Sequence, residues 1–512
     1  MEKWGLTIER LNLRKPEGEH FIMKKFLSSV LTIVVIAAIL VTPISVSAAD
    51  GGEYIQSVFD MIVDMYKGDL DNQAVYEKMI RNMFESLDEF TEYYDLEEAE
   101  VLFQQLENSV EGIGIMVSDI AGGITIVEFL EDSPAREAGL MIGDVIVSAD
   151  DKDLTGMTST VAVNYIKGKS GTTVRIGVKR GGSDKILYFD VVRKHIVINP
   201  VTLKFIDDRI AYIKISTFSF DADVFFDRAM EEVKKAGIDN IILDLRNNGG
   251  GSVQAAVNVA KHFVPGGVIS VLDYESDRVQ DIVYTNDLTE NPYNLVVLVN
   301  KYTASSSELL AGAIRDTYCG TVIGEKTWGK SVFQQLIPIV NYEAFKICYD
   351  ATKIPMISYY DLFEYGIFVP ERYIMGYLKL TVGEYLTPAG RRINNVGVRP
   401  HKVILNILTQ NDVNIESLST LYEVKEYNPG DKGPEILLAK YILKAAGYQT
   451  ELNSDTLDER ASEIIKQYQK DNGLTATGSL NFETQKALNR DVAKMKQDAD
   501  KQLRKAIDIL SD

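Results

Sequence analysis

A serine and a lysine, Ser305 and Lys330, could form a nucleophile and its base. Ser305 follows an apolar stretch at 295–299 and precedes a predicted helix at about 306–316, so it stands at a strand-to-helix turn. Backbone N–H groups point outward at the start of a helix, where the helix dipole favours negative charge. Such a turn can stabilise an oxyanion. The pair therefore predicts acyl transfer at a Ser–Lys site.

Lys330 must be neutral to act as a base, and its surroundings decide whether it is. An ordinary lysine pKa of about 10.4 keeps the amine charged near neutrality, whereas burial without a counter-ion lowers that pKa. No acidic residue occurs between Lys326 and Gln334. If residues 330–334 are extended, Lys330 and Gln334 share one face, and the amide can hold a neutral amine. Trp328, Val332 and Phe333 are expected to keep water away from the Lys330 amine.

Two alternatives compete with this assignment. Ser306 or Ser307 could be the nucleophile, and a run of serines is also typical of a helix cap; Ser305 is preferred because it stands at the turn. A Ser-His-Asp triad would need a histidine beside an acid. Of the four histidines, His262 is expected to be structural and His195 and His401 lie near domain edges, and none of these three is accompanied by an acidic motif.

A glycine run at Gly249-Gly250-Gly251 could supply the second part of an oxyanion site. It lies between a predicted buried strand at 238–245 and a helix that opens at Ser252. The run does not match the phosphate-binding patterns, so a backbone donor for an oxyanion is the preferred interpretation. Alternating strands and helices over residues 196–410 predict an α/β core.

Residues 109–195 resemble a PDZ domain. The resemblance rests on Gly112-Ile113-Gly114-Ile115 before a strand, on the pattern SPAREAGLMIGD at 133–144, and on an amphipathic helix at 158–167. It implies that the C-terminus of a peptide adds as a strand to an exposed sheet edge. The peptide carboxylate would meet backbone N–H groups from Gly112 to Ile115, where glycine permits a close approach.

Three motifs together resemble the tail-specific, C-terminal processing serine peptidases. They are LDLRNNGG at 243–250, TASSSE at 303–308, and Gly329-Lys330 with Gln334. That family joins a PDZ domain to a crotonase-like α/β core. The resemblance implies that Ser305 is the nucleophile, Lys330 the general base and Gln334 the residue that orients the lysine. It assigns the oxyanion hole to the N–H groups of Ser306 and of Gly249 or Gly250, and it implies a reaction without cofactor or metal.

Residues 1–49 have the layout of an export signal. Met23-Lys24-Lys25 is a positively charged start, residues 26–41 form an apolar run, Pro43 breaks it, and Val46-Ser47-Ala48 supplies small residues for cleavage. Translation is expected to begin at Met23. The run is short for a spanning helix, and an uncleaved anchor is the alternative. An extracytoplasmic protein is therefore expected, either secreted or held on the outer face of the cytoplasmic membrane.

Helical periodicity marks both flanks of the predicted peptidase. Residues 50–108 are expected to form helices whose apolar faces pack on the chain itself or pair with a second subunit. Residues 428–490 resemble a three-helix peptidoglycan-binding module. The resemblance rests on the motifs GDKG, YQKDNGL and ETQKAL, and it implies association with the cell wall. A linker at 411–427 precedes it. A charged helix at 491–512 follows, and could also serve a homodimer.

The remaining features limit the range of functions. A formal charge of −20 argues against a nucleic-acid partner. Cys319 and Cys348 are expected to be free thiols rather than a disulfide. An aromatic insertion at 341–375 could line a substrate tunnel, cover the site, contact another subunit or form a packed surface excursion.

The sequence thus predicts a multidomain α/β protein. Its parts are a crotonase-like serine peptidase core with an inserted, mostly β PDZ domain, N-terminal helices and a C-terminal three-helix module. The expected function is that of an exported endopeptidase that recognises accessible C-terminal segments of proteins. The alternative is a catalytically silent scaffold that binds peptides and cell wall.

Overall fold

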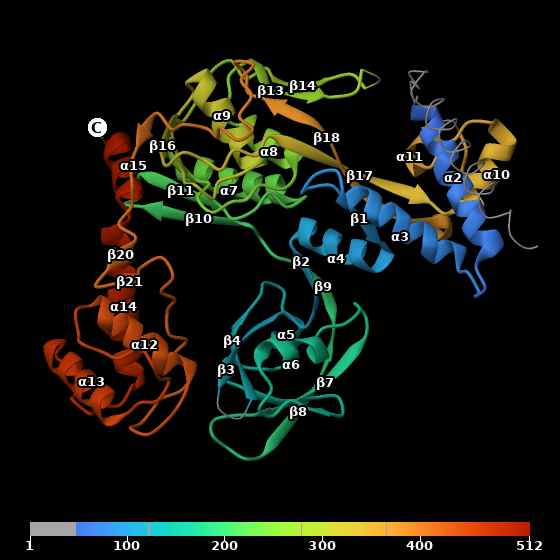
Figure 1. The fold of residues 1–512 in the computed structure, drawn as a ribbon. Helices are drawn as coiled ribbons and strands as arrows, with labels where there is room; N and C mark the ends of the chain where they lie inside the picture. The colour runs from blue at the N-terminus through green and yellow to red at the C-terminus, as the bar shows by residue number, and fades with distance from the viewer. Residues whose placement is uncertain (1–47, 121–122, 278, 365, 512) are drawn as a thin grey trace, which may run out of the picture. The chain divides into compact units, whose positions relative to one another are not determined.

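The computed structural model describes residues 48–120, 123–277, 279–364 and 366–511 (Figure 1). The predicted signal segment and the start at Met23 lie outside the described residues. Compact units of the chain divide after Met79. Within the described ranges, every helix is too short or too polar to cross a membrane.

The N-terminal helices form where the apolar periodicity predicts them. Helix α2 spans Ala48–Met65 and α3 spans Asn72–Glu85, and the rings of Phe59 and Tyr76 stack 4.8 Å apart. Much of the apolar surface of α2 faces solvent. The exposed residues are Tyr54, Ile55, Met61, Ile62, Val63 and Met65. Pairing of this face with a second subunit stays a prediction.

A six-stranded sheet forms the centre of the peptidase core, and its inner strands are parallel. In spatial order the strands are β10 (Val201–Ile206), β11 (Ile210–Ile215), β12 (Asn240–Asp244), β15 (Asn294–Val299), β16 (Thr321–Gly324) and β19 (Lys402–Val403). Alternate residues of β12 and β15 belong to different apolar clusters, so both faces of the sheet are covered.

Different helices cover the two faces of this sheet. Side chains of α7 (Ala222–Ala236), α8 (Val253–Ala260) and α9 (Ser306–Thr317) share one cluster with Leu243 and Val297. On the other face, α15 (Lys501–Ser511) packs Leu503, Ala506 and Ile507 against Ile242, Val296 and Leu298. The charged C-terminal helix of the sequence analysis is therefore amphipathic, and it forms one layer of the core.

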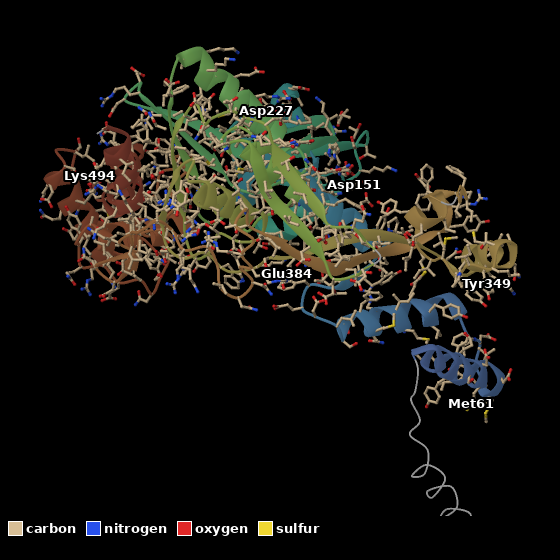
Figure 2. The ribbon with its side chains drawn as sticks, turned by 90° about the horizontal axis from the view of Figure 1, so that it is seen from above. Met61, Asp151, Asp227, Tyr349, Glu384 and Lys494 are labelled. Atoms are coloured by element: carbon tan, nitrogen blue, oxygen red, sulfur yellow. The ribbon has the colours of Figure 1, made fainter. Side chains whose placement is uncertain are left out.

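A second sheet is antiparallel and carries the aromatic insertion. Its strands are β1 (Glu92–Asp95), β18 (Ile374–Leu386), β13 (Gly267–Tyr274), β14 (Ile282–Asn286) and β17 (Val332–Val340). The insertion joins β17 to β18 through α10 (Tyr342–Thr352) and α11 (Tyr359–Glu364), and it has an apolar cluster of its own. In Figure 2, Glu384 lies at one end of the β17–β18 pair, and Tyr349, on α10 of the insertion, lies at the other end. The insertion therefore has a packed core of its own, while Tyr360, Phe363 and Phe368 stay exposed, and a contact with substrate or another subunit stays a prediction.

Strand β1 was not predicted, because residues 50–108 were expected to be wholly helical. It pairs antiparallel with β18, with Tyr93 opposite Leu378, and it is followed by α4 (Leu96–Glu107). Asp95 caps α4 by accepting a hydrogen bond from the Glu98 N–H. The short polar segment EYYD carries no apolar alternation, so only the exposed edge of β18 determines that it is a strand.

The predicted PDZ module is a small sheet with two helices. Its strands are β3 (Ile115–Ile120), β4 (Gly123–Phe129), β5 (Val145–Ala149), β6 (Lys152–Asp153), β7 (Thr173–Lys179) and β8 (Ile186–Val192). Strand β3 lies at the sheet edge. Helices α5 (Pro134–Glu137) and α6 (Ser159–Ile166) complete the module, and a ribbon of β2 (Ser109–Gly112) and β9 (Lys194–Val197) links both of its ends to the rest of the chain.

The C-terminal module contains α12 (Pro434–Ala445), α13 (Glu459–Asp471) and α14 (Phe482–Ala499). Its apolar cluster extends beyond the predicted boundaries. Four residues of the predicted linker join it, namely Val413, Ile415, Leu418 and Leu421. Helix α14 also runs through the predicted boundary at 490, because Val492 and Met495 continue its buried face. A β20–β21 hairpin (Thr409–Gln410, Val413–Asn414) begins this unit.

A buried charge on α15 should destabilise the peptidase core. Ala506 is fully buried against the sheet, so Ala506→Asp should lower the free energy of unfolding by at least about 3 kcal/mol. Lys501→Asp places the same side chain at an exposed position of this helix and should change stability by less than about 0.5 kcal/mol. Urea unfolding followed by circular dichroism measures both, and equal stability of the two variants would contradict the docking of α15.

Candidate active site

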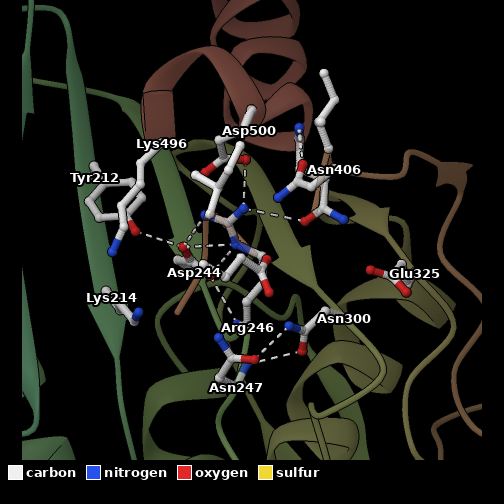
Figure 3. Close-up of a pocket in the computed structure, with 15 residues that line it drawn as sticks. Tyr212, Lys214, Asp244, Arg246, Asn247, Asn300, Glu325, Asn406, Lys496 and Asp500 are labelled. Atoms are coloured by element: carbon white, nitrogen blue, oxygen red, sulfur yellow. Dashed lines mark hydrogen bonds and ion pairs between the residues drawn. The ribbon is translucent and has the colours of Figure 1, made fainter. Parts of the chain in front are cut away.

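The turn after β12 is fixed by a buried ion pair. Asp244 ends the strand, and its carboxylate accepts hydrogen bonds from Arg246 at 2.6 Å and from the Tyr212 hydroxyl at 2.6 Å. The Arg246 guanidinium also donates to Asp500 Oδ1 at 2.7 Å, and Figure 3 shows it held between the two acids. These partners raise the pKa of Arg246 despite its burial, so it stays charged. The C-terminal segment thereby supports the turn that leads into the glycine run.

Hydrogen bonds join this turn to the serine turn after β15. Asn247 and Asn300 bond each other twice, since the Asn247 N–H donates at 3.0 Å and the Asn300 amide donates back at 2.8 Å (Figure 3). The Thr303 hydroxyl donates to Leu245 O at 2.9 Å, and the Ala304 N–H donates to Asn248 O at 3.0 Å. The two loops therefore form one rigid unit.

Ser305 occupies a strained position at the start of α9. Its φ of 57° and ψ of −127° lie in a region that residues other than glycine seldom adopt. A Cβ on Gly250 would lie 2.7 Å from Ser305 Cβ, so only glycine allows the loops to approach this closely. Ser306 and Ser307 are fully buried. Their hydroxyls find no partner among the described residues. Of the three serines, only Ser305 is partly exposed.

Two backbone N–H groups beside Ser305 are unoccupied. The Gly250 N–H donates to Asn248 Oδ1 at 2.9 Å, so it is already engaged. Within the described ranges, neither the Gly249 N–H nor the Ser306 N–H donates a hydrogen bond. Of the two glycines that the sequence left open, Gly249 is therefore the better oxyanion donor, paired with Ser306.

One buried carboxylate binds the serine and lysine segments together. Glu308 accepts hydrogen bonds from the N–H groups of Ser305 at 2.9 Å, Gly329 at 2.7 Å and Lys330 at 2.8 Å, and from the Thr327 hydroxyl at 2.5 Å. Burial raises the pKa of Glu308, and these four donors oppose that shift. In the sequence, Glu308 stands out only as the last residue of the TASSSE motif.

Tyr385 on β18 makes a second link between the two segments. Its hydroxyl lies within hydrogen-bond distance of two carbonyl oxygens, at 2.7 Å from Ser305 O and 2.5 Å from Lys330 O. Burial raises the pKa of Tyr385 well above its ordinary value, so the hydroxyl keeps its proton. The backbones of the predicted nucleophile and base are therefore held side by side.

The Lys330 side chain faces Gln334 and an aromatic ring. Its Nζ donates to Gln334 Oε1 at 3.3 Å and lies 4.2 Å from the centroid of the Phe90 ring. Burial lowers the pKa of Lys330, and the charge of Lys379 lowers it further, whereas the acids of the Phe90 loop oppose the shift. In the described part of the chain, no hydrogen bond joins Lys330 Nζ to Ser305 Oγ.

Of the residues expected to surround Lys330, Trp328 does not provide a dry cover. Trp328 is 63% exposed, and Phe333 packs edge-on against Tyr274 at 5.0 Å. The cover over the amine comes instead from Phe90, which precedes β1. No local sequence pattern near Lys330 could have indicated this contact, because it depends on the pairing of β1 with β18.

The histidines of the described residues do not complete a triad. His262 pairs with Asp227 at 2.7 Å and His195 approaches Glu107 at 3.4 Å, although neither acid stands near its histidine in the sequence. His401 Nδ1 accepts from the Val322 N–H at 3.0 Å. Among the residues described, no histidine is hydrogen-bonded to Ser305.

The predicted carboxylate-binding loop stands beside the free edge of β3. Gly114 has a φ of 70°, and a Cβ there would lie 3.0 Å from Ser133 Cα. The carbonyls of Ile113 and Gly114 accept hydrogen bonds from Ala135 and Leu130. In the described chain, the Ile113 and Gly114 N–H groups have no acceptor. A peptide carboxylate could therefore be received there.

Comparison with known families agrees with this architecture. Peptidase family S41 matches residues 209–404, a PDZ domain matches 112–191, and a peptidoglycan binding domain matches 432–488. Similar proteins include the carboxy-terminal processing proteases CtpA and CtpB of Bacillus subtilis, which are 29% and 28% identical over 458 and 465 residues. These alignments cover 89% of this chain in both cases, and 89% and 88% of the relatives.

Among solved structures, the photosystem II D1 C-terminal processing protease is 26% identical, with a TM-score of 0.38, over 68% of this chain and 86% of that chain. Residues 209–404 are thus a domain of peptidase family S41. The chain is a carboxy-terminal processing protease with a PDZ domain. The family and the fold class predicted from the sequence are thereby confirmed.

Removing the negative charge of Glu308 should disable the site. Glu308→Gln preserves shape but places an NH₂ group among N–H donors, so at least one charge-assisted hydrogen bond is lost. We expect a loss of about 2 kcal/mol or more in stability. Labelling of the serine by a fluorophosphonate should also slow at least about a hundredfold, since both segments shift. Glu325→Gln changes a nearby, half-exposed acid and should alter neither quantity. Wild-type labelling by Glu308→Gln would contradict the role of Glu308.

Proposed function

We propose that this peptidase cleaves proteins through an acyl-enzyme formed on Ser305, with Lys330 as the general base. The observation that carries the proposal is the single carboxylate of Glu308, which holds the backbones of both residues next to two unoccupied N–H groups. Ser305 is also the accessible hydroxyl of the three. These features support a prebuilt site rather than a serine that merely caps a helix.

In the proposed reaction, neutral Lys330 Nζ takes the Ser305 proton as Oγ attacks the scissile carbonyl carbon. The oxyanion that forms accepts hydrogen bonds from the Gly249 and Ser306 N–H groups. When the C–N bond breaks, Lys330 returns the proton to the departing amine. Water then attacks the ester, with Lys330 again taking and returning a proton. For the first proton transfer, Lys330 Nζ must come within hydrogen-bond distance of Ser305 Oγ, and such hydrogen bonds often tighten only when substrate binds.

Substrate selection is proposed to begin at the PDZ domain. The free edge of β3 can pair with an extended peptide, and the unoccupied N–H groups of Ile113 and Gly114 can receive its terminal carboxylate. This would bring the C-terminal segments of protein substrates to the chain. Cleavage would then occur at internal bonds of the same segment.

The peptidoglycan-binding domain supports an extracytoplasmic site of action at the cell wall. A homodimer through the N-terminal helices also fits the exposed apolar residues of α2. The other predicted dimer element, the C-terminal helix, is largely occupied by packing on its own chain. We therefore favour α2 for subunit contact.

The catalytic assignment predicts complete loss of proteolysis in Ser305→Ala and Lys330→Ala, with folding retained. Ser307→Ala is the matched control, because it removes a neighbouring hydroxyl that faces the core, and it should keep activity within a few-fold. Full activity in Ser305→Ala would refute the assignment. Cleavage of an unstructured protein, measured by gel, and circular dichroism provide the two readouts.

The pH dependence of cleavage should reflect the neutral form of Lys330. Because burial lowers the pKa of Lys330, activity should rise with pH and reach half its maximum below about 10.4, the ordinary lysine value. The initial rate of peptide cleavage, measured from pH 5 to 10, tests this. A rate that falls as pH increases through this range would exclude Lys330 as the base.

Peptide binding should depend on a free terminal carboxylate. With the inactive Ser305→Ala chain, amidation of a fluorescent peptide should weaken binding at least about tenfold, because the charge-assisted hydrogen bonds to the loop are lost. Fluorescence anisotropy measures the affinity. Equal binding of the acid and the amide would locate recognition away from the loop at Ile113 and Gly114.

A further inference from the structure

The loop between α3 and β1 lies outside the segment that matches the peptidase family, yet it reaches the proposed base. Residues 86–91 form this loop. Asp88 fixes its shape by accepting hydrogen bonds from the Phe90 N–H at 2.7 Å, the Thr91 N–H at 3.0 Å and the Thr91 hydroxyl at 2.7 Å. Pairing of β1 with β18 holds the loop against the second sheet.

Two contacts connect this loop with Lys330. The first is direct, since Lys330 Nζ lies 4.2 Å from the Phe90 ring centroid. The second is a relay. The Thr381 hydroxyl donates to Asp88 Oδ1 at 3.3 Å and accepts from Gln334 Nε2 at 3.1 Å, while Gln334 Oε1 accepts from Lys330 Nζ at 3.3 Å. The Thr381 N–H donates to Thr91 Oγ1 at 3.1 Å and holds the loop in register.

The relay determines which way the Gln334 amide points. A hydroxyl has one proton, and Thr381 uses it on Asp88. Toward Gln334 it can then only accept, so it takes the NH₂ end of the amide. The oxygen end is thereby turned to Lys330. An amide oxygen holds the amine through one N–H and leaves the lone pair of a neutral amine free for the serine proton.

We propose that residues 88–91 are the positioning element of the general base: the Phe90 ring seats the Lys330 amine, and Asp88 orients Gln334 through Thr381. This inference rests on the proposed role of Lys330. It assigns part of the catalytic machinery to the N-terminal region, which the sequence analysis treated only as helices for packing or subunit contact.

The Phe90 ring should act on Lys330 in two opposing ways. It excludes water from the amine, which disfavours the charged form, and its face attracts an ammonium, which favours that form. The other charges that face this amine are Lys379 on β18 and the loop acids Asp88 and Glu89. Glu308 bonds the Lys330 backbone. Lys379 is itself engaged by Glu92 at 2.7 Å, so it is held in place.

Two substitutions of Phe90 should therefore move the pH profile in opposite directions. Phe90→Leu keeps the apolar cover without the aromatic face, so the rise of activity should move to lower pH by about 0.5 unit. Phe90→Ala admits water, so the rise should move to higher pH. Phe90→Tyr keeps the ring face and should resemble the wild type. If Phe90 served packing alone, Phe90→Leu and Phe90→Ala would not shift the pH profile in opposite directions.

The measurement is the second-order rate of fluorophosphonate labelling of the full chain from pH 5 to 10, which does not require peptide capture. Phe363→Leu makes the same change at an exposed residue of the insertion and should leave the profile unmoved. Thr381→Val, which removes the relay, should slow labelling about tenfold or more at every pH, and Thr381→Ser should restore the rate.

The outcomes separate this inference from the proposed function. If Ser305→Ala or Lys330→Ala still labels or cleaves at the wild-type rate, the catalytic assignment itself fails. If both are inactive while the leucine and alanine variants, folded by circular dichroism, show the wild-type profile or shift together, only the positioning role is overturned. A wild-type rate in Thr381→Val would overturn the relay.

Discussion

The active site depends on one buried carboxylate that bonds to two separate segments. Glu308 is a residue of α9, and its side chain closes over the N–H groups of Ser305 in its own cap and of Gly329 and Lys330 before β17. A carboxylate without donors would be costly at this depth, and unpaired N–H groups would be costly as well. Each satisfies the other only when the two segments are adjacent. The placement of the proposed nucleophile and base is therefore the arrangement that leaves no buried polar group of this network unpaired.

The strain at Ser305 has the same origin. A positive φ on a serine persists only where the surroundings over-determine it. Here Gly250 admits the serine Cβ at close range, Tyr385 holds the Ser305 carbonyl, and Glu308 holds its N–H. With its carbonyl and N–H both bonded, the residue presents its hydroxyl beside the free N–H groups of Gly249 and Ser306. Local strain is thus maintained by contacts from three different parts of the fold.

Residues within continuous motifs could be predicted from the sequence, and residues that meet through tertiary pairing could not. The motifs at 243–250 and 303–308 predicted the family, the α/β core and the grouping of Ser305 with the glycine run. The partners of Lys330 were assigned to sequence neighbours such as Trp328, yet the ring over the amine is Phe90. That contact requires β1 on the edge of β18, and a four-residue polar strand carries no periodicity that would reveal it.

The position of α15 has a consequence for how this protein matures. The helix that covers one face of the central sheet follows the whole peptidoglycan-binding module in sequence. Because domains fold as they emerge during synthesis, that face of the sheet lacks its cover until this module has been made. The Asp500 that bonds Arg246 arrives equally late. The core of residues 209–404 is therefore completed by a helix made after a separate module, so the order of the elements delays a finished core until that module has been synthesised.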